Sequence, residues 1–354
     1  MHNIAILDLS KILLFRKLLL LIRSEPPRRI IFTGFYNGQT VFLVQRDIKL
    51  LHQQVKAGEF LAIARGITIV ENELPGYATL LQNLHEGHHA RVIGITGPPG
   101  AGKSTLVSAL LHYWLKENKK IAVIAVDPSS PFNYGALLGD RIRMSEYYTN
   151  PNIFIRSLAT RGALGGLSAK IIEITDLVKE APFDYILVET VGVGQSEVEI
   201  AGLADCTIVA LVPEAGDEVQ TLKAGIMEIA NIFIVNKADR ADAEGLYRNL
   251  RILAHEKATE DGETPVIKTV ATANTGIEEL ANAITSFLSH QNELPEKRLH
   301  LMTEKCWQLI ISQRMSNIDH NRLKEELTAA MQQDNFNLYA FTKDFLQRSD
   351  REQK

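Results

Sequence analysis

The stretch RVIGITGPPGAGKST, residues 91–105, decides the fold. It starts as an apolar run typical of a buried strand, passes through a glycine-rich turn, and continues as a helical sequence. The turn, Gly97–Ser104, matches the pattern GxxxxGKS/T at every fixed position. Glycines let backbone N–H groups surround phosphate oxygens, and the N-terminus of the following helix attracts the same anion. We therefore predict a P-loop that binds the phosphates of a nucleotide.

Two side chains of this loop are expected to act on the phosphates. Lys103 should reach the β and γ phosphates and neutralise charge during phosphoryl transfer, and Ser104 should ligate Mg²⁺. The whole loop is expected to contact the nucleotide, through Gly97, Pro98, Pro99, Gly100, Ala101, Gly102, Lys103, Ser104 and Thr105.

Short apolar runs continue on both sides of the loop and alternate with helical stretches. Continuous apolarity indicates strands buried on both faces, and alternation with helices indicates parallel pairing. We expect an α/β fold with a doubly wound, mostly parallel sheet of the P-loop NTPase kind. The expected strands are residues 91–96, 121–126, 152–157, 185–190, 206–212, 231–236 and 265–271.

Length and composition allow one large domain with helical extensions. The 354 residues can bury a substantial core, and the 45% hydrophobic and 23% charged fractions are close to globular averages. The expected organisation has an extension over residues 1–46, an N-terminal helical segment over 47–90, the nucleotide domain over 91–290, and a C-terminal helical region over 291–354.

Charge and cysteine content exclude several classes of protein. Because the formal net charge is -4, no global basic field exists to attract nucleic acid. Cys206 and Cys306 lack CxxC spacing, which argues against a disulfide framework and suits a reducing compartment such as the cytoplasm.

The first 46 residues are rich in Leu and Ile but interrupted by charges. The longest aliphatic stretch, Leu18–Ile22, is far shorter than the ~20 apolar residues of a membrane span, so no integral membrane insertion is expected. A signal peptide is not indicated either. Two interpretations stay open: a basic amphipathic targeting or membrane-surface helix, or a dispensable, disordered or wrongly assigned extension.

The sequence NKAD at 236–239 follows a buried strand and predicts guanine specificity. The Asp239 carboxylate can accept hydrogen bonds from N1–H and the 2-amino group of guanine, whereas adenine would leave it unpaired. We therefore expect GTP or GDP rather than ATP. Backbone of the segment 269–273 should lie against the base, so the expected base contacts are Asn236, Lys237, Asp239, Ala271 and Thr272.

An acidic element, VETVGVGQSE at 188–197, predicts the magnesium and γ-phosphate sensor. Glu189 should act on Mg²⁺, and the Gly192 N–H should meet the γ-phosphate. Glutamate is one methylene longer than the usual aspartate, so it suits a water-mediated role or a metal held partly by other acids. Asp127 and Asp140 are the candidates for those acids.

The group that positions the attacking water has two candidates, Gln195 and Asp140. The expected catalytic set is therefore Lys103, Asp140, Glu189 and Gln195. We expect slow intrinsic turnover, accelerated by a partner that orders the loops at 134–143 and 214–223.

Several long motifs resemble the MeaB/ArgK family of GTPases, within the SIMIBI class of P-loop proteins. The motifs are VDPSSPFNYGALLGDRIRM at 126–144, FIRSLATRGALGGLS at 154–168, ETVGVGQSE at 189–197 and GDEVQTLKAGIMEIANIFIVNKAD at 216–239. The resemblance runs from about Asp47 to the C-terminus. It implies a homodimeric GTPase that acts as a chaperone, gating adenosylcobalamin loading and protecting methylmalonyl-CoA mutase or a related mutase.

The resemblance also implies residue roles. It places Lys103 and Ser104 at phosphate and Mg²⁺, places acids around the metal (Asp127, Asp140 and Glu189), and places Asn236, Lys237 and Asp239 at guanine. A partner-sensing loop maps onto 214–223, with matches at Asp217, Gln220 and Lys223. Four positions depart from the family pattern, namely Tyr134, Ala163, Glu214 and Asn231.

Three alternative functions stay open. A metallochaperone GTPase would use the histidines of HEGHH at 85–89. An amino-acid transport-associated ATPase or kinase follows an older label of the family, although NKAD argues against it. A nucleotide-locked binding module would hold GTP without hydrolysing it.

Overall fold

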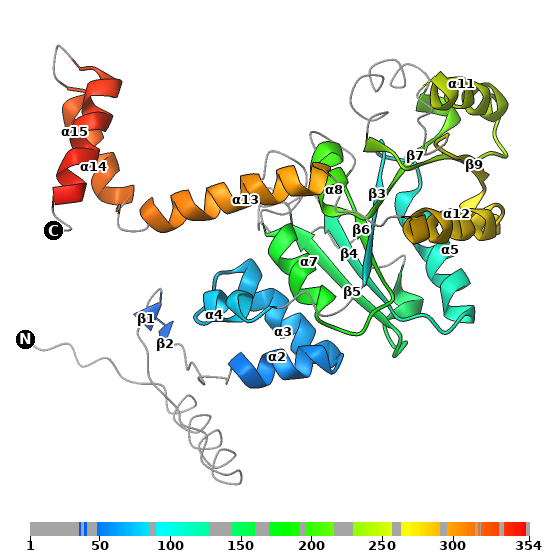
Figure 1. Cartoon of the computed structure of the whole chain (residues 1–354), viewed down its shortest axis with the longest axis horizontal. Helices are drawn as coiled ribbons and strands as arrows, with labels where there is room; N and C mark the ends of the chain where they lie inside the picture. Colours follow the sequence, from blue (N-terminus) through cyan, green and yellow to red (C-terminus); the bar gives the residue numbers. More distant parts are fainter. Residues whose placement is uncertain are drawn as a thin grey trace, which may run out of the picture.

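The computed structural model describes residues 35–36, 39–40, 48–84, 90–127, 144–159, 170–191, 196–215, 229–256, 263–290, 296–315, 318, 320–332 and 336–351. Its centre is a seven-stranded sheet in the order β5-β4-β6-β3-β7-β8-β9 (Figure 1). The strands are β3 Arg91–Thr96, β4 Ile121–Asp127, β5 Ile153–Ala159, β6 Tyr185–Glu189, β7 Cys206–Leu211, β8 Ile232–Asn236 and β9 Val266–Thr269.

Every neighbouring pair in this sheet is parallel, which confirms the predicted fold class. All seven apolar runs form strands whose ends lie within two residues of the expected ends. The central strand β3 lies between β6 and β7, so the chain reverses its winding direction there. Ligands of doubly wound sheets bind at such a switch point, outside the carboxyl ends of the strands.

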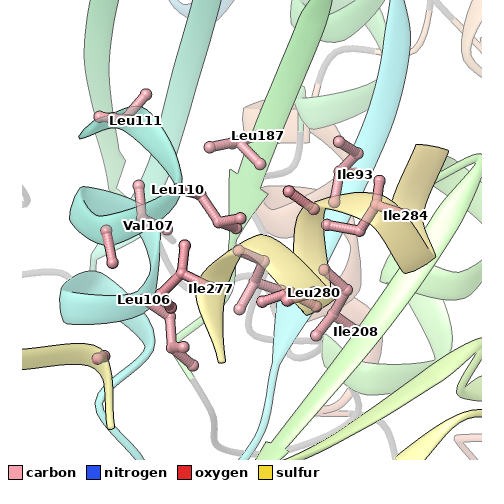
Figure 2. Close-up of a cluster of buried hydrophobic side chains, with 14 of the residues drawn as sticks. Ile93, Leu106, Val107, Leu110, Leu111, Leu187, Ile208, Ile277, Leu280 and Ile284 are labelled. Atoms are coloured by element: carbon pink, nitrogen blue, oxygen red, sulfur yellow. The ribbon is translucent and has the colours of Figure 1, made fainter. Parts of the chain in front are cut away.

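Helices α5 Lys103–Lys116 and α12 Ile277–His290 cover one face of the sheet (Figure 2). Their aliphatic side chains pack on alternate strand residues such as Ile93, Leu187 and Ile208 in one buried cluster. This packing anchors α5, whose first turn follows the P-loop directly.

The other face carries α7 Ile171–Lys179, α8 Ser196–Leu203, α11 Ala243–Glu256 and the N-terminal helices. Those N-terminal helices are α2 Ile48–Lys56, α3 Phe60–Glu71 and α4 Tyr77–Gln82. Their apolar residues share a core cluster with α7 and with strands β4 and β6.

Ion pairs also join the N-terminal helices to the sheet layer. The buried Glu180, after α7, lies 2.7 Å from His52 Nε2 and 3.3 Å from Lys56 Nζ, both on α2. Arg156 of β5 lies 3.1 Å from Glu71 of α3. The helical segment therefore packs as a layer on the nucleotide domain.

The C-terminal helices are α13 Glu296–Met315, α14 His320–Ala330 and α15 Leu338–Arg351. Helix α13 packs against α8 and then leads away from the sheet to α14 and α15 (Figure 1). It exposes several large apolar side chains, namely Leu299, Met302, Trp307, Leu309, Ile310 and Ile311.

Three short helical turns complete the described chain: η1 Ser145–Tyr147, η2 Pro213–Ala215 and η3 Ala271–Ala273. Strands β1 Phe35–Tyr36 and β2 Gln39–Thr40 form a separate antiparallel pair. Among the helices of the described ranges, none combines the length and hydropathy that a bilayer crossing requires.

Candidate nucleotide-binding site

The P-loop is pressed between the ends of neighbouring strands, and two glycines make this possible. Gly97 has φ 139°, and a Cβ there would lie 2.1 Å from the Ala210 carbonyl oxygen. Gly102 has φ 83°, and its Cβ would lie 2.5 Å from Asn236 Nδ2. Because both positions have positive φ and no room for a side chain, only glycine fits without distortion.

Lys103 begins α5, and its side chain folds back into the loop. Its buried Nζ donates hydrogen bonds to the carbonyl oxygens of Gly97, at 2.8 Å, and Pro98, at 3.1 Å. A positive charge is thus held inside a loop at a helix N-terminus, an arrangement that suits an anion.

Ser104 and Glu189 meet although they are far apart in the sequence. The Ser104 Oγ donates to Glu189 Oε1 at 2.6 Å, and the residues are 5% and 4% exposed. The longer glutamate side chain therefore spans the gap between the end of β6 and the first turn of α5. A hydroxyl and a carboxylate oxygen are the hard donors that Mg²⁺ takes, so this pair fits that ion.

Of the other two expected acids, the structure describes the backbone of Asp127. Asp127 is the last residue of β4, which runs beside β6, so its backbone lies at the same edge of the sheet as Glu189. Asp140 lies outside the described residues. Within the part of the chain that the structure describes, no three His, Cys, Asp or Glu side chains gather closely enough to hold a metal ion.

Asn236 connects the NKAD segment to two other segments through side-chain hydrogen bonds. Its Nδ2 donates to the Ala101 carbonyl oxygen at 2.8 Å, and its Oδ1 accepts from Thr269 Oγ1 at 3.1 Å and from the Ala271 N–H at 3.3 Å. One buried amide thus joins the P-loop, the end of β8 and the turn after β9.

The rest of the NKAD segment lies over the P-loop and beside a pocket. Lys237 has φ 55°, and its Nζ donates to the Gly100 carbonyl oxygen at 2.8 Å. The exposed Asp239 lines a pocket of about 390 Å³ together with Ala238, Thr269 and Val270. Ala271 is buried and Thr272 is exposed at the neighbouring turn.

The structure therefore brings together residues 97–105, Glu189, residues 236–239 and the turn at 271–272. Gly192 and Gln195 lie outside the described residues, as do Tyr134, Ala163, the histidines at 85–89 and the segment 216–228.

Two departures from the family pattern have structural partners. Glu214 forms an ion pair with Arg240, the residue after the NKAD segment, and the hydrogen bond from Arg240 lowers the pKa of Glu214. Asn231 Oδ1 accepts from the Thr207 N–H at 2.8 Å, a role that needs an oxygen but no charge.

The sequence predicts no side-chain role for three threonines next to the motifs, although Thr269 belongs to the segment whose backbone is expected at the base. Thr269 bonds to Asn236, while Thr96 and Thr190 bond to each other across β3 and β6 at 2.9 Å. A signal was available, because each is a polar residue at the end of an otherwise apolar strand beside a motif.

Comparison with protein families gives a match over residues 63–323. The matching family model is described as methylmalonyl Co-A mutase-associated GTPase MeaB. The matched range holds the P-loop, Glu189 and the NKAD segment.

Relatives and a solved structure agree with this match. A protein of Pyrococcus abyssi is 46% identical over 263 residues, covering 72% of this chain and 81% of the relative. GTPase ArgK of Escherichia coli is 37% identical over 247 residues, covering 66% and 74%. The mitochondrial methylmalonic aciduria type A homolog of Mus musculus is 33% identical over 293 residues, covering 75% and 70%. A crystal structure of a LAO/AO transport system kinase superposes with a TM-score of 0.62 at 25% identity, covering 89% of this chain and 100% of the other.

Proposed function

Since the chain belongs to the MeaB family of GTPases, we propose that it is a GTP-hydrolysing chaperone of an adenosylcobalamin-dependent acyl-CoA mutase. The observation that carries the proposal is the family match over residues 63–323, which contains the whole candidate nucleotide site. Methylmalonyl-CoA mutase is the first client to test. In this role the protein gates cofactor loading and protects the loaded mutase.

The P-loop holds the phosphates of GTP in this proposal. Backbone N–H groups of residues 100–105 surround the β and γ phosphates, and Lys103 Nζ exchanges its carbonyl partners for phosphate oxygens. Ser104 and Glu189, with Asp127 and Asp140, would hold Mg²⁺, which neutralises charge on the β and γ phosphates when bound.

Guanine binds beside Asp239, whose carboxylate accepts from N1–H and the 2-amino group. The Asn236 amide holds the NKAD segment at a fixed distance from the P-loop and from Ala271. The base-binding and phosphate-binding residues therefore keep fixed positions relative to each other. A purine without those two donors would leave Asp239 unpaired, which selects GTP over ATP.

Hydrolysis needs a group that orients the attacking water, and Gln195 and Asp140 are the two candidates. We propose that turnover is slow until the mutase orders the segments 134–143 and 214–223. Binding of the mutase is thereby linked to the nucleotide site, because the mutase and the nucleotide act on the same conformational equilibrium of these two segments.

The protein acts as a homodimer in this proposal, held through α13 to α15. The exposed apolar side chains of α13, among them Leu299, Met302 and Leu309, support it, because exposed apolar side chains on one side of a helix mark interaction sites. We expect the dimer to work in the cytoplasm, without nucleic acid as a partner.

The proposal is tested by measuring GTP hydrolysis with and without methylmalonyl-CoA mutase, and by capturing the mutase on immobilised protein loaded with GDP or a non-hydrolysable GTP analogue. We expect nucleotide-dependent capture and faster hydrolysis with the mutase. Lys103→Ala serves as the inactive control. Fast hydrolysis that no adenosylcobalamin-dependent mutase changes would contradict the chaperone role.

A further inference from the structure

Two buried hydroxyl groups form a bridge beside the proposed magnesium pair. Thr96 ends β3 immediately before the P-loop, and Thr190 follows Glu189 immediately after β6. Their Oγ1 atoms lie 2.9 Å apart, and the residues are 0% and 2% exposed. The Thr190 N–H also donates to the Ile95 carbonyl oxygen at 3.1 Å, so the pairing of β3 with β6 continues to this residue.

The bridge lies on the opposite face of the sheet from Glu189. Strand side chains alternate between faces, and Glu189 points toward α5, where it meets Ser104. Thr96 and Thr190 therefore share the face of Gly94, whose absent Cβ would lie 2.5 Å from Ile200 of α8. Two side-chain hydrogen bonds thus connect β6 to the P-loop segment, one on each face and one residue apart.

Hydroxyl groups are not needed here to fill space. Valine has the same shape as threonine, and replacing both partners of a buried hydrogen bond by apolar groups can be nearly neutral for stability. The hydroxyl pair fixes the relative position of the two residues, because a hydrogen bond holds its two atoms within a narrow range of distance and angle. The bridge therefore sets where the chain leaves β6 relative to the start of the P-loop.

We infer that Thr190 is a positioning residue for GTP hydrolysis. Through Thr96, its hydroxyl fixes the end of β6, so that the Glu189 carboxylate stays at Ser104. This inference rests on the proposed role of Ser104 and Glu189 at Mg²⁺.

The test compares Thr190→Val, Thr190→Ser, Thr96→Val and the double valine variant in the full-length protein. Thr207→Val is the matched control, because Thr207 is a buried threonine of the neighbouring strand β7, opposite Gly94, and takes no part in the bridge. Three quantities are measured: intrinsic GTP hydrolysis, the Mg²⁺ concentration for half-maximal binding of a fluorescent non-hydrolysable GTP analogue, and affinity for fluorescent GDP in EDTA. Melting temperatures monitor folding.

We expect Thr190→Val to lower kcat roughly tenfold, less than the ~10²-fold that a 1 Å misplacement of catalytic groups can cost. The Mg²⁺ midpoint should rise several-fold, while KM for GTP and GDP affinity without Mg²⁺ stay close to wild type. Thr190→Ser should keep most of the activity because it keeps the hydroxyl. The double variant should be no worse than Thr190→Val, since the bridge is lost once.

Three outcomes would overturn the inference: wild-type kcat and Mg²⁺ midpoint in Thr190→Val, an equal loss in Thr207→Val, or additive losses in the double variant. The Mg²⁺ midpoint decides the matter even where turnover is too slow to measure. A failure of the chaperone proposal is a separate result, because it appears as wild-type hydrolysis that no mutase changes.

Discussion

At the scale of single residues, Glu189 is the side chain that most distinguishes this site. Its Oε1 accepts from Ser104 Oγ at 2.6 Å, so Glu189→Gln keeps one acceptor oxygen of the same reach and removes the charge and the second oxygen. We expect hydrolysis at limiting Mg²⁺ to fall by about 10–100-fold, as for other residues that support a metal site. Hydrolysis measured against Mg²⁺ concentration tests this, with GDP binding in EDTA as the control. Loss of GDP binding would instead indicate a structural role.

For Asp239 we predict a change of nucleotide specificity on substitution by asparagine. Asp239→Asn replaces the acceptor of two guanine donors by an amide that can pair with the 2-oxygen of xanthine. GTP affinity should fall by up to roughly 10⁴-fold, and xanthosine triphosphate should restore hydrolysis. Equal loss for both nucleotides would place the base elsewhere.

The two cysteines should differ sharply in reactivity. Burial raises the pKa of Cys206 to about 12, and the charge of Asp205 adds to the shift. Because the thiolate is the reactive form, Cys206 stays protonated and unreactive at pH 8, whereas Cys306 is exposed on α13.

A thiol-reactive dye checks this difference. In a Cys306→Ser variant, no thiol should react in the native protein, and one should react after unfolding in guanidinium. Rapid labelling of the native variant would show that β7 opens near Cys206.

At the scale of elements, the sequence predicts strands better than it predicts contacts between them. Each apolar run became a strand because burial on both faces demands continuous apolarity, and that pattern is local. The motifs predict that Ser104 and Glu189 meet at one metal ion. The direct hydrogen bonds of Asn236 to Ala101 and of Glu189 to Ser104 could not be predicted, because the partners lie 135 and 85 residues apart along the chain. Such distances close only when the sheet order is known.

A helix supplies a stability prediction at this scale. Thr175 of α7 is fully buried, and its Oγ1 has no hydrogen-bond partner among the described residues. Thr175→Val keeps the shape and the β-branch but removes a buried hydroxyl without a partner, so we expect about 1 kcal/mol of added stability. Urea unfolding measures the change, with Thr207→Val as a comparison. A destabilised Thr175→Val would mean that an ordered water satisfies the hydroxyl.

At the scale of the whole molecule, the layers explain how distant segments form one site. The P-loop, the end of β6, the NKAD segment and the turn after β9 all lie at the carboxyl ends of parallel strands, so one edge of the sheet collects them. Helix α8 follows the Glu189 element and packs against α13. Helix α13 is therefore in contact with the helix that follows the Glu189 element.

The exposed side of α13 leads to a prediction about the oligomeric state. On α13, Leu299, Met302 and Leu309 are exposed at spacings that place them along one side of the helix. If this side is the dimer interface, a variant with both Met302→Glu and Leu309→Glu should be monomeric by sedimentation equilibrium, because burying unpaired carboxylates in an apolar interface has a large desolvation penalty. The variant should still bind GDP. Ile252→Glu, which alters an equally exposed residue of α11, should leave the dimer intact. A wild-type protein that sediments as a monomer at all concentrations, or a dimer that survives both charges, would contradict assembly through α13.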